Sequence, residues 1–141
     1  MYSLIYRIGL ALIIGTALLA GCGSSPQAAC QEQVKSYAQQ INPITAEWGE
    51  ATKRAGSASG ASLAPEIDGL QAIRKRTDGV TVPECARDAH GLLTRSMDME
   101  IQGFRDTMAQ KPVTTVQQEF SDAAKAFGDF QAEILRLSGA P

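Results

Sequence analysis

Cysteine and histidine are the scarcest reactive residues of this 141-residue chain. It has three cysteines, Cys22, Cys30 and Cys85, and one histidine, His90. Because these four residues do not show the spacing of zinc ligands, the sequence predicts no metal site and no cofactor. His90 is a candidate general base, but its charged neighbours are typical of a histidine at the solvated edge of a helix. The cysteines therefore carry the stronger chemical signal.

Other catalytic patterns are missing from the sequence. No serine lies in a Gly-x-Ser-x-Gly turn, and no glycine-rich loop is suited to hold a phosphate. Asp98 and Glu100 are two residues apart, which places them on different sides of a helix. A mechanism that uses paired carboxylates would need a partner from another helix. We therefore predict no catalytic residue and a non-enzymatic protein, with converging carboxylates as the basis of the less favoured alternative, an enzyme.

The N-terminal segment has the pattern of an export signal. Arg7 precedes an apolar or small stretch, 8–20, which as a helix would span about 20 Å, less than the roughly 30 Å of bilayer hydrocarbon. The stretch leads directly into Leu-Ala-Gly-Cys at 19–22, where small residues fit a protease site and the Cys22 thiol is a nucleophile for lipidation. This segment closely resembles the lipobox of bacterial lipoproteins.

The resemblance implies that residues 1–21 are a cleaved signal peptide and that Cys22 carries a diacylglyceryl group, usually with a further N-acyl chain. Each buried methylene contributes about 0.8 kcal/mol, so two or three chains would hold the protein at the membrane almost permanently. The alternatives are an ordinary secretory signal with a chance cysteine and an uncleaved anchor helix. We expect a cell-envelope protein that is lipid-anchored to the outer face of the cell membrane or to the outer membrane. Gly23 is compatible with either.

The remaining cysteines form an even pair once Cys22 is acylated. In an oxidising compartment we predict a disulfide between Cys30 and Cys85, with two buried free thiols as the alternative. The chain is 44% hydrophobic, but much of this lies in the leader, so the mature domain has a thin core that a disulfide would support. The net charge of −2 gives no electrostatic basis for binding nucleic acid.

The apolar periodicity predicts four helices and no strand. After a flexible lipidated tether at 22–29, the domain at 30–141 holds the helices, which we place at about 29–55, 63–77, 83–111 and 113–137. Pro43 either kinks the first helix or begins a new one. Short connections predict an all-α, up-down-up-down four-helix bundle. In that topology the first and third helices begin at the tethered end, where Cys30 and Cys85 would meet.

A basic cluster, Arg74-Lys75-Arg76, closes the second predicted helix. Cations are favourable at a helix C-terminus, and this is the simpler interpretation. Because the topology places the end of this helix at the tethered end, the three cations are also predicted to contact anionic lipid headgroups, at about 1 kcal/mol each.

Small and aromatic residues inside the helices allow two interpretations. Glycines within helices mark either a close approach of two helices or space for a ligand, and we expect the close approach; they are Gly49, Gly91, Gly103 and Gly128. Trp48 falls on an apolar stripe and is expected in the core, with a pocket near Pro43 as the alternative.

A second, loose resemblance lies between residues 70 and 108. The positions that carry it are Leu70, Ile73-Arg74, Val82-Pro83, Cys85, Met97, Ile101 and Phe104–Met108. They resemble a pattern in small helical exported proteins of bacteria, which implies no known activity. We expect a tethered, non-enzymatic module whose partner is an unidentified protein or small ligand. The alternative is a helper subunit that binds an apolar ligand between its helices.

Overall fold

Four α-helices make up almost all of the computed structural model, which describes residues 25–139. They are α1 (Pro26–Ser57), α2 (Leu63–Thr77), α3 (Arg87–Met108) and α4 (Val113–Ser138); short 3₁₀ turns at Gly60–Ser62 and Glu84–Ala86 precede α2 and α3. Within these residues there is no strand, so the all-α prediction is confirmed. The predicted signal peptide and Cys22 lie outside the described residues.

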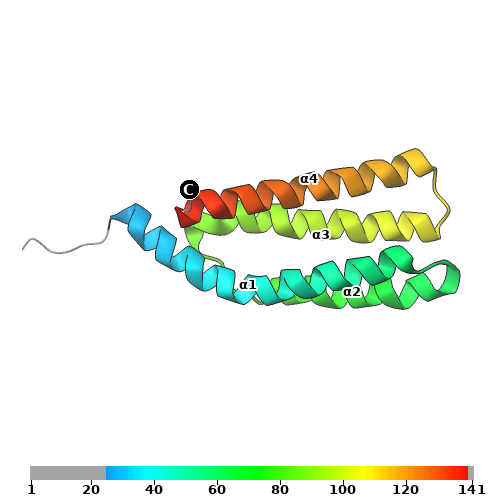
Figure 1. The fold of residues 1–141 in the computed structure, drawn as a ribbon, viewed down its shortest axis with the longest axis horizontal. Coiled ribbons are helices and arrows are strands. Elements are labelled where there is room, and N and C mark those ends of the chain that lie inside the picture. Colours follow the sequence, from blue (N-terminus) through cyan, green and yellow to red (C-terminus); the bar gives the residue numbers. More distant parts are fainter. Residues whose placement is uncertain (1–24, 140–141) are drawn as a thin grey trace, which may run out of the picture.

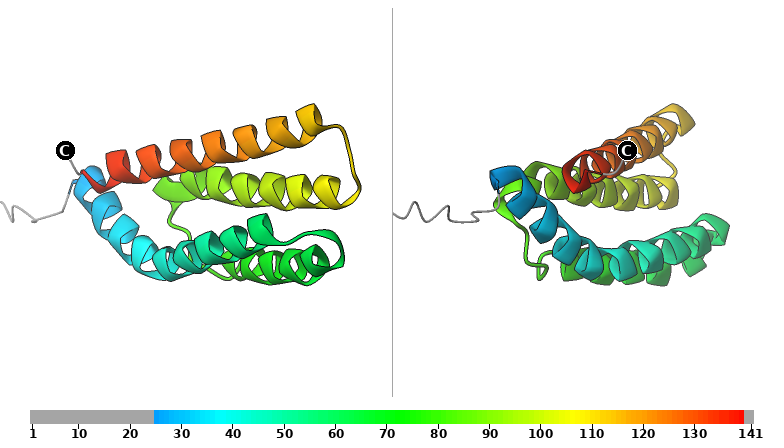
Figure 2. Two further views of the ribbon diagram at one scale, coloured as in Figure 1. Left: turned by 45° about the vertical axis from the view of Figure 1, so that its right-hand side comes forward. Right: turned by 60° about the vertical axis from the view of Figure 1, so that its left-hand side comes forward.

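The helices form two hairpins, one of α1 and α2 and one of α3 and α4 (Figure 1). In the views of Figures 1 and 2 the chain reverses direction after each helix, and α1 begins at the same end of the molecule as α4 finishes. Gly139, which follows α4 with a left-handed backbone (φ 69°), lies against the side chain of Gln31 in α1. The two ends of the described chain are therefore neighbours.

α1 is one helix that passes through Pro43. It begins after Ser25, whose hydroxyl accepts a hydrogen bond from the backbone N–H of Ala28 at 3.2 Å, with Pro26 in the first turn. This cap makes residues 26–29 helical, although we expected them in the flexible tether. Pro43 lacks a backbone N–H and crowds the preceding turn, and α1 bends near its middle (Figure 2). Pro43 thus kinks α1 and does not begin a new helix.

α2 is about half as long as α1, so it ends near the middle of α1 and not at the tethered end. The two helices have 15 and 32 residues, or about 23 Å and 48 Å. Arg76 at the end of α2 forms an ion pair with Glu47 of α1. Glu47 lies 17 residues, or roughly 25 Å, along α1 from Cys30. The prediction that α2 ends beside the tether was therefore wrong, because α2 is too short to reach that end.

The disulfide between Cys30 and Cys85 is present, with 6.2 Å between the two Cα atoms. It joins the second turn of α1 to the 3₁₀ turn before α3, across 55 residues of sequence. Pro83 precedes this turn, so α3 starts at Arg87, later than we expected. The beginnings of α1 and α3 are thus held together covalently.

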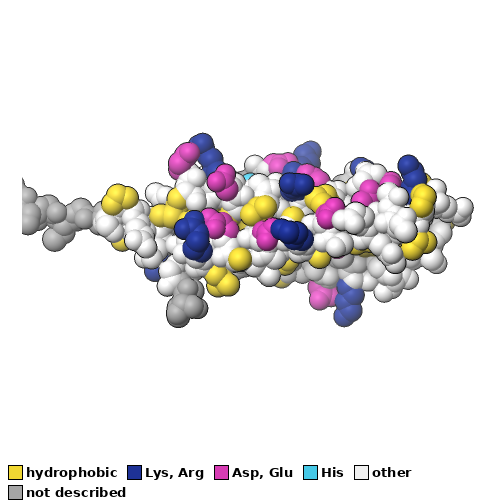
Figure 3. All heavy atoms as spheres, turned by 90° about the horizontal axis from the view of Figure 1, so that it is seen from above, with side chains coloured by type: hydrophobic (Ala, Val, Ile, Leu, Met, Phe, Trp, Pro, Cys, Tyr) yellow, Lys and Arg dark blue, Asp and Glu magenta, His cyan; other side chains and the backbone are white. Residues whose placement is uncertain are grey.

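All four helices contribute to one hydrophobic core, and each fully buried large side chain in it contributes about 1.5–3 kcal/mol. Its large members are Tyr37, Ile41, Trp48, Leu63, Ile67, Leu70, Ile73, Leu93, Met97, Ile101, Phe104 and Phe130. Outside the core, acidic and basic side chains lie close to one another on the face shown in Figure 3, with hydrophobic side chains scattered between them. On α4 they form the ion pairs Lys125–Asp129 and Glu133–Arg136.

Candidate functional site

A groove runs between the two hairpins, and we call it the interhairpin groove. It consists of two adjoining hollows of about 420 and 340 Å³ that share Thr52, Glu100 and Phe120. The first hollow is also lined by Thr45, Trp48, Gly49, Ser96, Ala123, Ala124 and Phe127, and the second by Ala55, Gly56, Ala58, Leu63, Phe104 and Thr107. α1, α3 and α4 therefore form most of its walls, and most of the lining is apolar or small.

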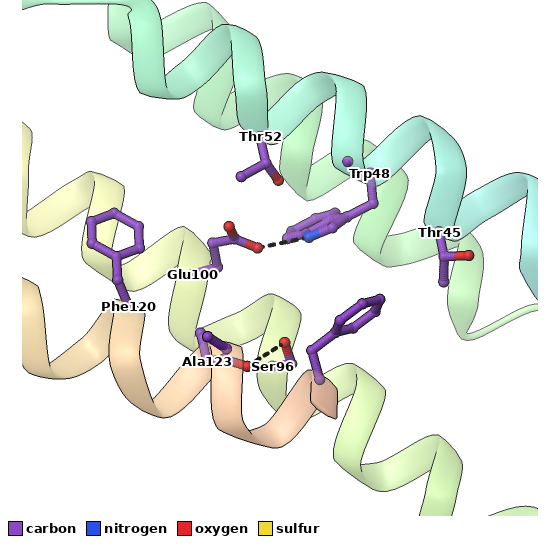
Figure 4. A pocket seen from close by; sticks show the side chains of 10 residues that line it. Thr45, Trp48, Thr52, Ser96, Glu100, Phe120 and Ala123 are labelled. Atoms are coloured by element: carbon purple, nitrogen blue, oxygen red, sulfur yellow. Dashed lines mark hydrogen bonds between the residues drawn. The ribbon is translucent and has the colours of Figure 1, made fainter. Parts of the chain in front are cut away.

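Glu100 lies in the middle of the groove, where the two hollows meet. Its carboxylate accepts a hydrogen bond from the indole Nε1–H of Trp48, with 2.7 Å between the nitrogen and Oε2 (Figure 4). Among the described residues that line the groove, Glu100 is the sole titratable group, and no lysine or arginine lies beside it. The groove thus contains one carboxylate without a cationic partner.

Burial raises the pKa of Glu100 above its ordinary value, because desolvation disfavours the charged carboxylate. The Trp48 N–H and the neighbouring Thr52 hydroxyl oppose this shift, since both favour the charged form. The hydroxyl oxygen of Thr52 is itself buried and makes no hydrogen bond of ordinary geometry. The Thr52 hydroxyl therefore has hydrogen-bonding capacity beside Glu100 that no described residue uses.

Ser96 has a structural role in the wall of the groove. Its hydroxyl donates a hydrogen bond to the backbone carbonyl of Ala123 at 2.9 Å, which joins α3 to α4 (Figure 4). The hydroxyl is buried and satisfied within the protein, so Glu100 is the polar group of α3 that a ligand would meet in the first hollow.

The helical glycines divide between the two interpretations. Gly49 lines the groove, and a Cβ atom placed there would meet no atom within 4 Å, so this glycine leaves space. Gly103 is the opposite case, because a Cβ atom there would lie 3.0 Å from the ring of Phe120. The expected close approach is confirmed at Gly103 and is wrong at Gly49. At Gly91 and Gly128 a Cβ atom also meets nothing within 4 Å, so no close approach occurs there either.

His90 lies away from the groove, in a separate polar contact. Its Nδ1 is 3.0 Å from the hydroxyl of Tyr37, a side chain that is fully buried in α1. Burial lowers the pKa of His90, and the nearby Arg74 guanidinium lowers it further while Asp78 opposes the change. Burial also raises the pKa of Tyr37 to about 12. His90 is thus a half-buried hydrogen-bonding partner rather than a solvated edge residue.

The basic cluster at the end of α2 is largely paired with carboxylates. Arg74 contacts both oxygens of Asp98, at 2.8 and 3.2 Å, and Asp78 at 2.7 Å, which joins α2 to α3. Arg76 pairs with Glu47, and Lys75 has no ion pair among the described contacts. The cluster also lies near the middle of α1, away from the tethered end, and its contact with lipid headgroups stays a prediction.

Carboxylates from different helices also meet at Asp106 of α3 and Glu119 of α4. Burial raises the pKa of Glu119, and the negative charge of Asp106 raises it further. The positive charge of Lys111 opposes this change. Gln102 donates a hydrogen bond to Asp106 at 2.7 Å. This pair lies outside the interhairpin groove, and within residues 25–139 no three metal-ligating side chains are gathered in one place.

Comparison of the chain with protein-family models, with curated proteins and with solved structures found no match. In the described part of the chain, none of the helices is both long and apolar enough to cross a bilayer. The site must therefore be interpreted from its own residues.

Sequence reasoning did not identify the Trp48–Glu100 pair as a site. A signal was present, since Glu100 is three residues after Met97 and four before Phe104, which places a carboxylate on the apolar stripe of α3. What the sequence could not show is that Trp48 of α1 lies opposite, because that depends on how the two hairpins pack.

Proposed function

We propose that this chain is a lipid-anchored, non-enzymatic protein of the cell envelope that binds an elongated, largely apolar small molecule in the interhairpin groove. The observation that carries the proposal is the groove itself. Its hollows of about 420 and 340 Å³ are each within the usual size range of small-molecule sites. Apolar walls with one central polar group are also typical of such sites.

The side chains around Glu100 support binding rather than chemical conversion. The Trp48 N–H, whose nitrogen lies 2.7 Å from Oε2 of Glu100, would orient the carboxylate. The lining residues of the groove include no second acid or base to take part in proton transfer and no cysteine. The Glu100 carboxylate is therefore better suited to hold a ligand in place than to transfer a proton.

The position of the groove relative to the predicted anchor also supports this function. From Cys22 to Pro26 the backbone spans at most about 14 Å, so acylation of Cys22 would keep the start of α1 near the bilayer. Trp48 lies 18 residues, or roughly 27 Å, beyond Cys30 along α1. A groove at this distance would be accessible from the aqueous side while the protein stays on the membrane.

A protein partner at the far end of the bundle has weaker support. Met108 and Val113, on either side of the α3–α4 turn, are 48% and 68% exposed. Two exposed hydrophobic residues are ordinary for a protein surface and do not form a large patch. The groove is therefore the better candidate for the binding site.

The test is to identify what the protein carries. The full lipidated chain is purified from membranes, and non-covalently bound molecules are extracted and identified by mass spectrometry. We expect a specific apolar molecule in the wild type and much less of it in Gly49→Leu, because the new side chain enters the first hollow, where Gly49 leaves space. Leucine is also a better helix former than glycine, so the fold should tolerate it.

Gly69→Leu is the matched control. Gly69 lies in α2 of the same hairpin, it is exposed, and a Cβ atom there also meets nothing within 4 Å, but it does not line the groove. This variant should carry as much ligand as the wild type. If the wild type and both variants yield the same extract, the groove is not the binding site.

A further inference from the structure

We infer that the ligand of the interhairpin groove is an amphiphile with an ammonium head, which binds at Glu100, and one alkyl or aryl chain, which lies along the hollows. This inference rests on the function proposed above and names the chemical class of the ligand. Its basis is the charge and the aromatic content of the groove.

The first feature of the groove that supports this inference is its charge. Glu100 is a half-buried carboxylate, and among the described residues that line the groove no cation compensates it. The Trp48 N–H occupies one of the roughly four acceptor positions of a carboxylate. A ligand that brings one positive charge and N–H donors would fill the remaining positions with charge-assisted hydrogen bonds. An anionic head would instead be repelled.

The second feature of the groove is its aromatic side chains. Trp48 on α1 and Phe120 and Phe127 on α4 line the same hollow as Glu100 (Figure 4). Aromatic faces attract ammonium groups, and because Trp48 presents its N–H edge to Glu100, we assign this attraction to Phe120 and Phe127. A carboxylate among aromatic rings is thus suited to an alkylammonium group rather than to a neutral alcohol.

The third feature of the groove is its apolar walls, which would hold the alkyl or aryl chain of the ligand. The two hollows adjoin at Glu100, and apart from Glu100 their walls carry only small, apolar or hydroxyl side chains. An apolar chain attached to the ammonium head could lie in either hollow and displace water from those walls. The groove therefore favours one head at its centre and one chain along it.

The experiment compares octylammonium, 1-octanol and octanoate, which share a chain and differ in the charge of the head. The full chain is held in phosphatidylcholine vesicles, with protein-free vesicles to correct for partition of each compound. Trp48 is the single tryptophan of the chain and donates to Glu100, so its fluorescence reports on the site directly. We expect octylammonium to bind about tenfold more tightly than octanol and octanoate to bind least.

Glu100→Gln should lower octylammonium affinity about tenfold, to the level of octanol, and leave octanol binding unchanged. The amide can still accept the Trp48 hydrogen bond, so the fold should persist, which circular dichroism would verify. The matched control is Glu50→Gln, which removes the same charge from an exposed position on α1 outside the groove. This control should keep the preference for octylammonium.

The outcomes separate this inference from the proposed function. If the three compounds bind equally, or if the preference for ammonium survives in Glu100→Gln, the ammonium assignment is wrong although the groove still binds apolar chains. If none of the compounds changes Trp48 fluorescence in the wild type, both the inference and the proposed function fail. A preference that is lost in Glu100→Gln and kept in Glu50→Gln supports both.

Discussion

The two halves of α1 lie in different surroundings, although both belong to one helix. Before Pro43, α1 is bound to the start of α3 by the Cys30–Cys85 disulfide, and Tyr37 is fully buried with its hydroxyl on His90. We call this part the closed half. After Pro43, α1 borders the interhairpin groove, and we call this part the open half.

The difference follows from the size of the residues that face each other. In the open half, Gly49 of α1 faces a hollow that is also bordered by Ala123 and Ala124 of α4, so the helices enclose space. In the closed half, Tyr37 is 0% exposed and its hydroxyl contacts His90 of α3, and a hollow of about 350 Å³ that borders this half is also lined by Thr81 and Glu84 of the loop and turn before α3. One part of the bundle is thus suited to stability and the other to binding, and the comparison can be tested in each.

The largest expected effect comes from the disulfide of the closed half. Replacing both cysteines, as Cys30→Ala with Cys85→Ala, should lower the free energy of unfolding by about 4 kcal/mol, because the disulfide constrains 55 residues of the unfolded chain. Urea unfolding followed by Trp48 fluorescence would measure this. A reducing agent should destabilise the wild type equally and leave the double variant unaffected. A loss below about 1 kcal/mol would show that the closed half does not depend on the cross-link.

The two kinds of glycine should give effects of opposite sign. Gly49→Ala should raise the free energy of unfolding by up to about 1 kcal/mol, since alanine favours the helix and the new methyl group enters open space. Gly103→Ala should lower it by about 1 kcal/mol, because the ring of Phe120 is 3.0 Å from the new Cβ atom and overpacking exceeds the helical gain. Thermal and urea unfolding of both variants would measure the difference. Equal effects at the two positions would contradict the contrast between open and packed sites.

The smallest expected effect is on pH dependence, where the two halves should respond in opposite directions. The pKa of His90 is lowered by burial, so its contribution to stability is present above its ordinary pKa of 6.5 and is lost as pH falls through the lowered value. The pKa of Glu100 is raised by burial, so its contribution is present below its ordinary pKa of 4.5 and is lost as pH rises through the raised value.

Unfolding measured between pH 4 and 8 in the wild type and in Glu100→Gln would separate these contributions. We expect the variant to lose the gain in stability on the acid side and to keep the loss that is due to His90. At neutral pH the variant should be at least as stable as the wild type, because a neutral amide replaces a desolvated carboxylate. A variant whose pH profile matches that of the wild type would show that Glu100 is not perturbed by the groove.

Much of the fold could be predicted from the sequence because it depends on local patterns. The apolar stripes predict the four helices, and the disulfide follows from an even pair of cysteines, Cys30 and Cys85, at the starts of two helices that lie at the same end. α1 begins three residues earlier than expected, because Ser25 caps it. α2 ends at Thr77 as expected, but this end lies beside Glu47 and not at the tethered end, because a helix of 15 residues runs back along only about half of α1.

The groove could not be predicted, because it depends on which residues face each other across the two hairpins. Gly49 and Gly103 look alike in sequence, yet one borders open space and the other an aromatic ring. Glu100 stands out in the sequence as a carboxylate on the apolar stripe of α3, but its partner Trp48 is identified only by the packing of α1 against α3. These pairings are set by tertiary packing, between segments 52 residues apart for Trp48 and Glu100 and between the neighbouring helices α3 and α4 for Gly103 and Phe120.

The bend at Pro43 gives α1 the geometry of a lever with one fixed arm. Cys30 ties the arm before the bend to the start of α3, while the arm after it carries Trp48 and Thr52 along the groove. Thr52 lies nine residues, or about 14 Å, beyond Pro43, so a change of about 5° in the bend would displace it by about 1 Å. The width of the groove therefore depends on the bend at Pro43, and the ion pairs Glu47–Arg76 and Arg54–Glu66 hold this part of α1 to the α2 side of its hairpin.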